Sequence, residues 1–370
     1  MIKILYIVST LKRSGPTNVL YNLIDELDRS KFEPVILTLS PEETKFPSAK
    51  GSFVDINVDV HSLHLSRLEG ILSGRRQIKR FVKSQGVHAI HLMGFRGDLL
   101  ILPKDFKGVE IISTLNSNIF DDYSMLYGKR RGTLMAWLHI RSLRGKTPIA
   151  CSQFVSDKLY ERYKIRTRVI YNGIPKNLYK VSSTEDKRTA KKNLDLPAGK
   201  KVFVFIGSLI FRKDPVTAIK GFLNNTNLEN SHLIVLGDGP LMQDCKDVCA
   251  EHVEKVTFFG NQPETLKFLS ASDFYIATAY SEGLPTSVME AMGCGLPVIL
   301  SAIDPHKELV DKIDSWQYLF PVNQNTVLTD RINKIQADNY AILSSKCREV
   351  IDDHINSTKM AENYQLLYSR

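Results

Sequence analysis

The sequence predicts an α/β fold with two doubly wound, Rossmann-like domains, each a parallel sheet covered by helices. Short apolar runs bounded by turn residues alternate with helical segments in both halves of the chain. Strands that are apolar throughout are typical of parallel sheets buried on both faces. A length of 370 residues fits two domains, since a domain holds roughly 150 residues. With 43% hydrophobic and 24% charged residues, the composition excludes a disordered or fibrous chain.

The individual elements follow from the apolar pattern. The predicted strands are Ile2–Val8, Pro34–Leu39, Ala89–Leu92, Ile111–Thr114 and Ile149–Ala150 in the first half, and Val202–Ile206, His232–Leu236, Val256–Phe259, Phe274–Ile276 and Val298–Leu300 in the second. The predicted helices lie around Thr17–Leu27, Gln77–Lys83, Gly132–Leu143, Pro215–Phe222, Leu241–Cys249, Pro263–Leu269 and Thr286–Met292.

A domain boundary is expected near residue 178. Turn residues at Tyr171–Pro175 and a polar, charged stretch at Val181–Lys192 separate the two halves. We therefore expect an N-terminal domain at 1–178 and a C-terminal domain at 179–350. Residues Ser345–Arg370 are predicted to be helical, and we expect 351–370 to pack back on the N-terminal domain.

Composition also indicates the compartment. The five cysteines are few, odd in number and not arranged as CxxC pairs, which argues against a disulfide framework and for a reducing environment. No apolar run approaches the roughly 18–20 residues of a membrane-spanning helix. Residues Ile2–Val8 resemble a buried strand more than a signal peptide, because no small-residue cleavage site follows them. We expect a cytoplasmic protein.

Positive charge is concentrated in the first half of the chain. Residues 1–180 contain 29 Lys and Arg against 16 Asp and Glu, a net charge of +13, whereas residues 181–370 contain 20 against 24, a net charge of −4. This asymmetry favours an anionic partner for the first half: a membrane surface, a nucleic acid or a phosphorylated substrate. The alternative is a pair of solvated helix faces.

The segment Ser281–Ser301, SEGLPTSVMEAMGCGLPVILS, holds two glutamates, Glu282 and Glu290, with seven residues between them. Pro285 suits the first turn of a helix, so a strand-to-helix junction is predicted here. The free N–H groups and the positive dipole end of such a helix favour a phosphate or pyrophosphate. Glu290, further along the helix, can accept hydrogen bonds from two adjacent ribose hydroxyls. The alternative is an amphipathic helix with two surface glutamates.

This segment resembles the donor-site motif of the family 4 glycosyltransferases, in which seven residues separate two glutamates. The matching residues are Glu282, Gly283, Pro285, Glu290, Ala291, Met292, Gly295, Pro297 and Val298, while the serine lies one place closer to the first glutamate. Other blocks agree in order and spacing: Ser14–Val19, Val202–Phe222, Leu236–Pro240 and Val256–Gln262. The resemblance covers nearly the whole chain and is strongest in Val202–Val310.

The resemblance implies the GT-B fold, two Rossmann-like domains facing a cleft, and a retaining, metal-independent hexosyltransferase. It implies that a UDP- or GDP-linked sugar binds mainly to the C-terminal domain and the acceptor to the N-terminal domain. By resemblance, Arg212 and Lys213 clamp the donor phosphates, and Glu282 binds the sugar and stabilises the transition state without acting as a nucleophile. Donor contacts are expected from Gly15, Gly207, Gly239, Gly260, Gly283, Leu284, Pro285 and Glu290.

Arg212 and Lys213 also have a physical reason to act on a diphosphate. A diphosphate leaving group gathers negative charge as the glycosyl bond breaks, so cations at its oxygens stabilise the transition state more than the ground state. By resemblance, these two cations remove the need for a metal, and we expect no cofactor. The lack of an Asp-x-Asp pair and of a His/Cys cluster with ligand spacing in the sequence agrees with this. The alternative is a solvated basic turn.

Two residues depart from the family pattern. Relatives commonly carry a histidine at the position of Asn116, which contacts the sugar or acceptor, and many carry an arginine at the position of Ser208. His91 lies near the carboxyl end of the predicted strand Ala89–Leu92, and His306 lies in a loop after another predicted strand. In open α/β sheets these ends face the ligand crevice. We therefore treat Asn116 and His91 as weak candidates for acceptor or sugar contacts, and His306 as either a substrate contact or a solvated loop residue.

Two basic clusters, Arg75–Lys83 and Lys129–Lys146, lie in the first half. The second places Leu134, Trp137 and Ile140 among arginines and lysines, as an interfacial helix would. A peripheral protein on the inner face of the plasma membrane is one interpretation, and Trp137 as a core residue is the other. No recognition motif accompanies the charge, so we expect no nucleic acid partner.

The sequence thus predicts transfer of a sugar from a nucleotide sugar to a glycan or a polyprenyl-diphosphate-linked acceptor, in bacterial surface polysaccharide or lipopolysaccharide synthesis. Two alternatives stay open. A nucleotide-sugar epimerase of the same fold usually needs acidic and histidine residues around the sugar, and Asn116 argues against it. A catalytically inactive nucleotide-sugar-binding scaffold is favoured by Asn116 and Ser208. It is opposed by four intact residues of the donor motif, Glu282, Glu290, Arg212 and Lys213.

Overall fold

The computed structural model describes residues 1–42, 47–313 and 316–369. It contains two compact units, Met1–Gly173 with Ser357–Arg370, and Ile174–Asn356. The sequence suggested boundaries near residues 178 and 350, so both boundaries differ by a few residues from the expected ones. Arg370, the end of the predicted terminal helix, lies outside the described residues.

The N-terminal unit contains a seven-stranded sheet whose neighbouring strands are all parallel. The strands are β1 (Ile2–Val8), β2 (Phe32–Thr38), β3 (Asp59–Ser62), β4 (Ala89–Leu92), β5 (Glu110–Leu115), β6 (Thr147–Ala150) and β7 (Arg168–Val169). The helices are α1 (Gly15–Asp25), α2 (Lys50–Asp55), α3 (Arg67–Glu69), α4 (Arg75–Gln85), α5 (Phe95–Leu100), α6 (Ile119–Tyr127), α7 (Lys129–Ser142), α8 (Gln153–Tyr163) and α17 (Ser357–Tyr368). The order β3-β2-β1-β4-β5-β6-β7 is that of a doubly wound sheet.

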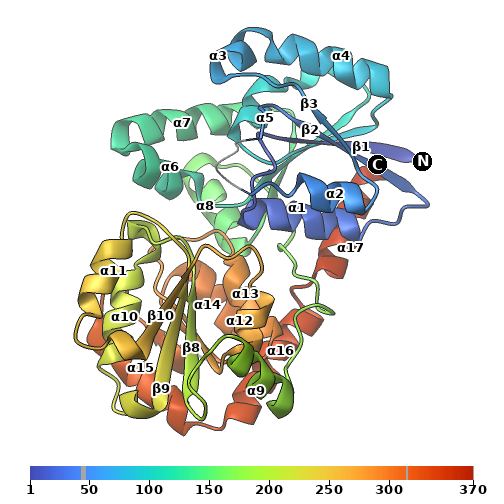
Figure 1. The fold of residues 1–370 in the computed structure, drawn as a ribbon. Helices are drawn as coiled ribbons and strands as arrows, with labels where there is room; N and C mark the ends of the chain where they lie inside the picture. The colour runs from blue at the N-terminus through green and yellow to red at the C-terminus, as the bar shows by residue number, and fades with distance from the viewer. Residues whose placement is uncertain (43–46, 314–315, 370) are drawn as a thin grey trace. The chain divides into compact units, whose positions relative to one another are not determined.

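Alternate residues of β1 serve two cores, one on each face of this sheet. Ile4 and Tyr6 pack with residues of α1 and α2, whereas Leu5 and Ile7 pack with residues of α4. Figure 1 shows α1 and α4 on opposite sides of the sheet. Burial of both faces explains why β1 is apolar throughout.

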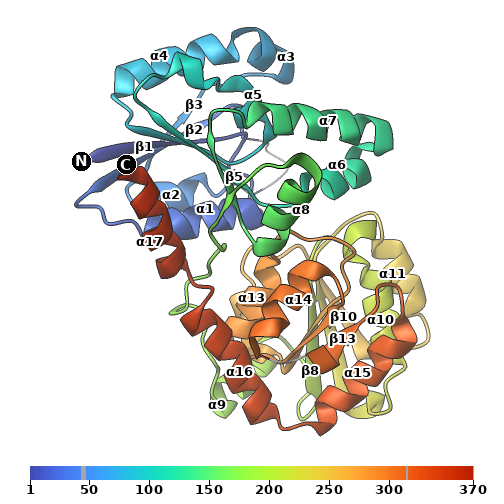
Figure 2. The same ribbon diagram turned by 180° about the vertical axis from the view of Figure 1, so that it is seen from behind.

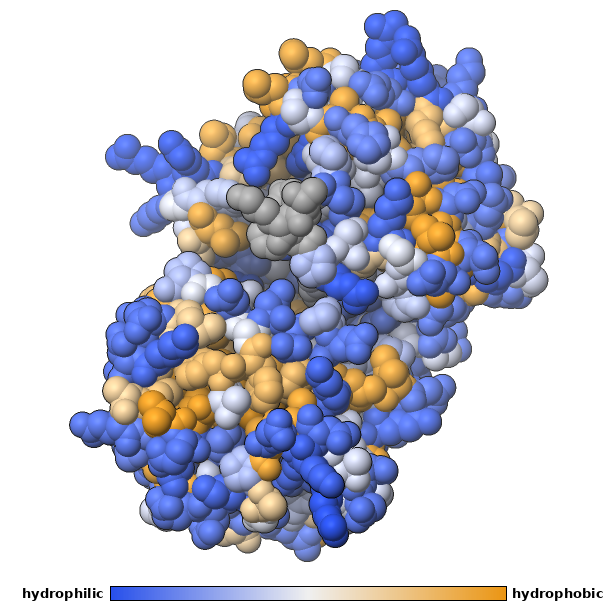
Figure 3. Space-filling view, in the orientation of Figure 1, coloured by the Kyte–Doolittle hydropathy of each residue, from blue (hydrophilic) through white to orange (hydrophobic). Residues whose placement is uncertain are grey.

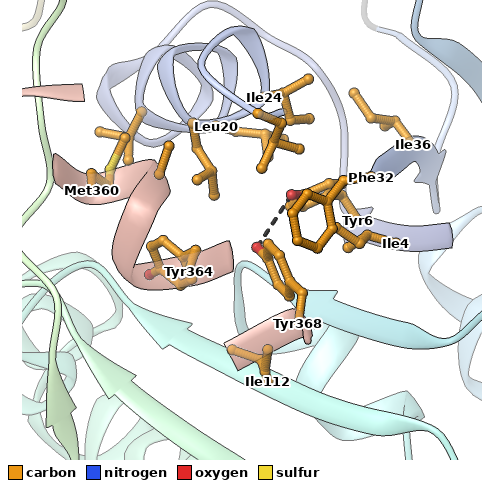
Figure 4. Close-up of a cluster of buried hydrophobic side chains, with 14 of the residues drawn as sticks. Ile4, Tyr6, Leu20, Ile24, Phe32, Ile36, Ile112, Met360, Tyr364 and Tyr368 are labelled. Atoms are coloured by element: carbon orange, nitrogen blue, oxygen red, sulfur yellow. Dashed lines mark hydrogen bonds between the residues drawn. The ribbon is translucent and has the colours of Figure 1, made fainter. Parts of the chain in front are cut away.

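Helix α17 belongs to the first of these cores although it comes last in the sequence. It lies beside α1 in the views of Figures 1 and 2. Met360, Tyr364 and Tyr368 enter the cluster formed by β1 and α1, and the Tyr6 hydroxyl donates a hydrogen bond to that of Tyr368 over 3.2 Å (Figure 4). The end of the chain therefore completes the N-terminal core.

The C-terminal unit contains a six-stranded parallel sheet in the order β10-β9-β8-β11-β12-β13. The strands are β8 (Lys201–Ile206), β9 (Ser231–Leu236), β10 (Val256–Gly260), β11 (Phe274–Ala277), β12 (Val298–Ser301) and β13 (Leu319–Phe320). The helices are α9 (Thr184–Asn193), α10 (Pro215–Leu223), α11 (Met242–Val248), α12 (Leu266–Ala271), α13 (Thr286–Gly293), α14 (Asp304–Val310), α15 (Asn325–Ala337) and α16 (Tyr340–Asp353). The predicted α/β architecture of two Rossmann-like units is confirmed.

The structure adds elements that the apolar pattern did not predict. Strand β3 is an edge strand with alternating partial exposure, and β7 and β13 have two residues each. The predicted continuous helix Ser345–Arg370 is wrong, because α16 ends at Asp353 and α17 begins at Ser357. The break at 354–356 separates a helix of the C-terminal unit from one of the N-terminal unit.

The order of the C-terminal sheet reverses between β8 and β11. In open α/β sheets, ligands bind outside the carboxyl ends of the strands at such a reversal. The loops that follow β8 and β11 are therefore the first place to look for a site. Within the described residues, no helix has the length and apolar character to span a bilayer.

Candidate functional site

The loops after β8 and β11 are bound to each other through their backbones. The β8 loop ends in a 3-10 turn, Phe211–Lys213, before α10 begins. The Thr278 hydroxyl donates to the carbonyl of Lys213 over 2.8 Å, and the Tyr280 N–H donates to the carbonyl of Arg212 over 2.8 Å. These bonds hold the backbone of Arg212 and Lys213 and so fix the positions from which the two basic side chains extend.

Arg212 and Lys213 share one carboxylate, that of Glu282. The Arg212 guanidinium donates to Glu282 Oε2 over 3.1 Å and to the Ser281 carbonyl over 2.7 Å, while Lys213 Nζ donates to Glu282 Oε1. Burial alone would raise the pKa of Glu282, but Lys213 and Arg212 outweigh it and lower the pKa. The cluster therefore combines two cations with one carboxylate and keeps an excess positive charge for an anion.

A small cavity of about 10 Å³ adjoins this cluster and is lined by Lys213, Glu282 and Ser287, among others. It also meets His306, a buried residue of α14 rather than a solvated loop residue. His306 Nδ1 faces the Ser301 carbonyl at 2.8 Å, and Nε2 has no hydrogen-bond partner among the described residues. Burial lowers the pKa of His306 to about 4, so the ring is neutral near pH 7.

Glu290 lies inside α13, and its environment differs from that of Glu282. The Thr265 hydroxyl donates to Glu290 Oε2 over 3.0 Å, and Tyr179 adds a second hydrogen bond. Burial raises the pKa of Glu290 to about 7, since no cation faces it in the way that Lys213 faces Glu282. Near neutral pH this carboxyl is therefore partly ionised, when it only accepts hydrogen bonds, and partly protonated, when it can also donate one.

The spacing of the two glutamates follows from the start of α13. Pro285 is the N-cap residue of the helix. Glu282, Gly283 and the buried Leu284 precede it. The Tyr275 hydroxyl of β11 donates to Ser287 Oγ over 2.8 Å and so ties the first turn to the sheet. One glutamate thus lies before the helix and the other within it.

The loops after β8, β9 and β10 approach one another at glycines near Arg212, Lys213 and Glu282. Gly207 donates its N–H to Leu236 over 3.0 Å, and Gly237 donates to Gly260 over 2.7 Å. A Cβ at Gly237, where φ is 140°, would collide with the carbonyl of Gly207, and one at Gly239 would lie 2.5 Å from the carbonyl of Leu209. The close approach of these backbones requires glycine at both positions.

Comparisons with known proteins identify the family. The model of glycosyl transferases group 1 matches residues 186–353, and that of Glycosyltransferase Family 4 matches residues 13–178. The chain belongs to glycosyltransferase family 4 and has the GT-B fold. It is a glycosyltransferase.

Relatives of this family 4 glycosyltransferase act in polysaccharide synthesis. An O-antigen biosynthesis glycosyltransferase of Escherichia coli, WclY, is 26% identical and covers 99% of this chain and 98% of its own. An E. coli UDP-Gal:alpha-D-GlcNAc-diphosphoundecaprenol alpha-1,3-galactosyltransferase is 27% identical over 63% of this chain and 62% of its own. The crystal structure of Anabaena HepE in complex with UDP-glucose has the same fold, with a TM-score of 0.82, 18% identity and full coverage of both chains.

In this glycosyltransferase the predicted donor residues of the C-terminal unit gather at one edge of its sheet. Arg212, Lys213 and Glu282 are in direct contact, and the glycine loops and Glu290 lie on adjacent elements. The sequence did not reveal Thr265, Tyr179 or His306 as neighbours of the two glutamates. Single polar residues far apart in the chain carry no spacing signal, so only the fold could show which of them lie beside the glutamates.

The predicted residues of the N-terminal unit are in three different settings. Gly15 is exposed at the start of α1, and Asn116 follows β5 and accepts a hydrogen bond from Asn172 over 3.1 Å. His91 lies within β4 and is fully buried, with Nδ1 at 2.7 Å from the Tyr368 hydroxyl and Nε2 at 2.7 Å from Thr114 Oγ1. Burial lowers its pKa to about 3. The expected substrate contact at His91 therefore has no support in the geometry.

Among the described residues, no group of His, Cys, Asp or Glu has an arrangement that could hold a metal ion. All five cysteines are buried and free of disulfides.

Proposed function

We propose that this glycosyltransferase moves a hexosyl group from a UDP-sugar, with retention of configuration and without a metal, to a lipid-linked glycan. The observation that carries the proposal is the pairing of Arg212 and Lys213 with the buried Glu282 at the topological switch of the C-terminal sheet. Guanidinium and ammonium groups are suited to the oxygens of a diphosphate. The UDP-glucose complex of HepE and the UDP-galactose donor of the E. coli relative support uridine as the nucleoside of the donor.

In the proposed reaction, the bond between the anomeric carbon and the β-phosphate oxygen breaks, and a bond to the acceptor oxygen forms on the same face. The acceptor hydroxyl proton passes to the departing phosphate oxygen, so UDP and the glycosylated acceptor are the products. Lys213 and Arg212 stabilise the charge that grows on the diphosphate. Glu282 binds sugar hydroxyls and orients the donor.

The ion pairs suggest how the site changes when the donor binds. A diphosphate carries more negative charge than Glu282, so it competes for Arg212 and Lys213 and leaves the carboxylate free to accept hydrogen bonds from the sugar. Glu282 then holds the two cations in position until the donor arrives. The matching role of Glu290 is to accept hydrogen bonds from the ribose hydroxyls of the nucleotide.

The acceptor class rests on the relatives. One acts in O-antigen biosynthesis, and the other has a diphosphoundecaprenol-linked sugar as its acceptor by name. We infer a polyprenyl-diphosphate-linked glycan as the acceptor here, and surface polysaccharide synthesis as the process. The N-terminal unit supplies its binding surface, with Asn116 as a candidate contact.

The test is a transfer assay with UDP-glucose, UDP-galactose and UDP-N-acetylglucosamine, a short polyprenyl-diphosphate-linked sugar as acceptor, and excess EDTA. We expect one donor to be consumed and the product to keep the anomeric configuration of the donor by NMR. Loss of activity in EDTA would contradict metal independence, and an inverted product would contradict retention. Conversion of one free UDP-sugar into another would identify an epimerase, and UDP binding without turnover would identify a scaffold.

We also propose that the N-terminal unit binds an anionic membrane at the α6–α7 patch, defined as Met125, Leu126, Tyr127, Leu134 and Trp137 with Lys129, Arg130 and Arg131. The five apolar side chains are 44–61% exposed, which argues against Trp137 as a core residue. Apolar side chains flanked by cations are typical of an interfacial segment, and each cation near an anionic leaflet contributes about 1 kcal/mol. The protein would then be peripheral, on the inner face of the plasma membrane.

Flotation with phosphatidylglycerol vesicles at low and high salt tests this patch. The double variant Leu126→Ser with Leu134→Ser should lose flotation at low salt. Leu178→Ser with Ile342→Ser, which changes two equally exposed residues of the C-terminal unit, is the matched control and should float like the wild type. Equal flotation of both variants would contradict the proposal.

A further inference from the structure

The N-terminal unit contains a second cavity, of about 470 Å³, that no step of the proposed reaction uses. It lies between the carboxyl-terminal ends of α7 and α8 and the first residues of β6. Figure 2 shows the two helices. Its lining residues are Trp137, Ile140, Arg141, Leu143, Arg144, Lys146, Pro148, Tyr163, Ile165 and Arg166. The volume lies within the roughly 300–1,000 Å³ typical of small-molecule sites.

This cavity is at the end of the sheet opposite to the expected acceptor side. Helices α7 and α8 end at Ser142 and Tyr163, directly before β6 and β7 begin, so the cavity sits at the amino ends of these strands. Asn116 follows the carboxyl end of β5, which is parallel to β6. The cavity is therefore a separate place and not part of the carboxyl-edge site.

The polar side of the cavity is made of arginines. Arg141, Arg144 and Arg166 are exposed, and no ion pair is recorded for any of them within the described part of the chain. The fourth cation, Lys146, is already neutralised, because its buried Nζ donates to Asp98 Oδ1 over 3.1 Å and to the Asp98 carbonyl over 2.6 Å. No aspartate or glutamate lines the cavity.

The remaining wall is apolar and aromatic. Trp137 is 51% exposed and has the Arg141 guanidinium 5.6 Å from its ring centre. Tyr163, Ile140, Ile165 and Pro148 complete the wall. A cavity with free guanidinium groups on one side and hydrocarbon on the other matches an anion with an apolar body.

We propose that this cavity binds a phosphate or diphosphate group carried on an apolar chain, with the phosphate among Arg141, Arg144 and Arg166 and the chain against Trp137 and Ile165. One guanidinium group can bind two phosphate oxygens at once. This favours a phosphate over a lipid or sugar that has no anionic group. The chemistry fits either a lipid headgroup in a bilayer or a soluble prenyl phosphate. The inference stands independently of the donor site, and the cavity shares one side chain, that of Trp137, with the α6–α7 patch.

The experiment measures binding of geranyl diphosphate by calorimetry to the full chain, in the presence of saturating UDP to occupy the donor site. Inorganic pyrophosphate and geraniol are the probes for the head and the tail alone. The double variant Arg144→Gln with Arg166→Gln removes two cavity cations. Lys107→Gln with Arg168→Gln removes two exposed cations of the same unit that do not line the cavity, and Lys213→Ala controls for the donor site.

We expect the wild type to bind geranyl diphosphate more tightly than pyrophosphate or geraniol. The cavity variant should bind it at least tenfold more weakly, since each lost charge-assisted hydrogen bond accounts for roughly a tenfold change. The two controls should bind like the wild type. Equal binding by the cavity variant, or equal affinity for pyrophosphate and geranyl diphosphate, would overturn the proposal.

Phosphatidylglycerol vesicles then distinguish the two sources of the ligand. If the cavity takes a lipid headgroup from the bilayer, Arg144→Gln with Arg166→Gln also weakens flotation beyond the loss seen in the matched charge control. If it takes a soluble prenyl phosphate only, flotation of the two double variants is equal while geranyl diphosphate binding still differs. Both results support the site and assign its ligand.

Discussion

The six strands of the C-terminal sheet follow the same order as β3 to β6 of the N-terminal sheet, which has β7 in addition, but the two sheets differ in the polar groups near their carboxyl ends. In the C-terminal unit, three charged side chains, Arg212, Lys213 and Glu282, form ion pairs where the strand order reverses. In the N-terminal unit, β4 and β5 end with a neutral, fully buried His91 and the amide of Asn116. The arginines that follow β1 and β4, Arg13 and Arg96, donate hydrogen bonds to serine hydroxyls. The C-terminal site thus contains two cations that share one buried carboxylate, whereas Arg13 and Arg96 bind neutral hydroxyl groups.

Other cations of the N-terminal unit are exposed on its helices and on the segments that follow α7 and α8. Exposed cations flank the apolar side chains of the α6–α7 patch, and three more line the second cavity. Figure 3 also shows apolar surface near α3. Leu68 of α3 is 74% exposed, and Ile71 and Leu72, in the turn that follows α3, are 75% and 86% exposed. The difference teaches that the C-terminal unit pairs its site cations with a buried carboxylate, whereas the N-terminal unit presents cations and apolar groups outwards.

The largest effect is expected when one of the two cations of the C-terminal site is removed. Lys213→Ala should lower turnover of the UDP-sugar by about 10²–10³-fold, as removal of a charge-stabilising donor does elsewhere, with a smaller effect on donor binding. Lys220→Ala, an exposed lysine on the following helix, should leave initial rates unchanged. Comparable rates for Lys213→Ala and wild type would remove Lys213 from the reaction.

A second prediction concerns the backbone that carries the internal site. Gly237→Ala should lower the free energy of unfolding by about 3 kcal/mol, because the new Cβ collides with the Gly207 carbonyl at a φ of 140°. Gly51→Ala, where nothing lies within 4 Å, should not destabilise the chain. Denaturant unfolding of the two variants checks the difference, and an equally small effect in both would show that the glycine loops have room to relax.

Glu290 provides a pH-dependent test. Its pKa is about 7 when folded and 4.5 ordinarily, so between these values the folded state binds a proton that the unfolded state does not. Stability therefore falls as the pH rises through this window. Relative to Glu290→Gln, the wild type should lose about 3 kcal/mol between pH 5 and pH 8, measured as the difference in unfolding free energy at the two pH values. A constant difference would mean that Glu290 is not buried in this way.

The smallest expected effect is in the neutral core of the N-terminal unit. Tyr368→Phe removes the hydroxyl that meets Tyr6 and the Nδ1 of His91, and should destabilise the chain by about 1–2 kcal/mol. UDP binding should be unchanged, because these groups belong to the N-terminal core. Tyr160→Phe, at a 46% exposed tyrosine, is the control for stability. A weakened UDP affinity in Tyr368→Phe alone would show that the two units are coupled.

The sequence predicted the donor-side elements well because the relevant signals are local. Strand β8, the basic pair after it and the glutamate spacing around α13 each depend on residues close together in the chain. A junction of strand and helix is encoded in Gly283–Pro285, so its position could be expected before the fold was known. The predicted strands Ile2–Val8 and Ala89–Leu92 agree with β1 and β4 for the same reason, because each is a local run of apolar residues.

What the sequence did not predict depends on partners far apart in the chain. His91 is enclosed by Tyr368, and Glu290 is held by Thr265 and Tyr179, which no local pattern connects. Strand β3 was missed because its residues alternate in exposure and form no apolar run. The break between α16 and α17 was missed because 354–356 contains neither glycine nor proline.

The central claim is that a donor diphosphate takes over the cations now held by Glu282. The most direct measurement is a crystal structure of the protein with UDP bound in the presence of EDTA. The account predicts diphosphate oxygens within hydrogen-bond distance of Arg212 and Lys213, with the Glu282 carboxylate released from at least one of them and Glu290 accepting hydrogen bonds from the ribose. UDP bound elsewhere, with both ion pairs of Glu282 intact, would contradict it.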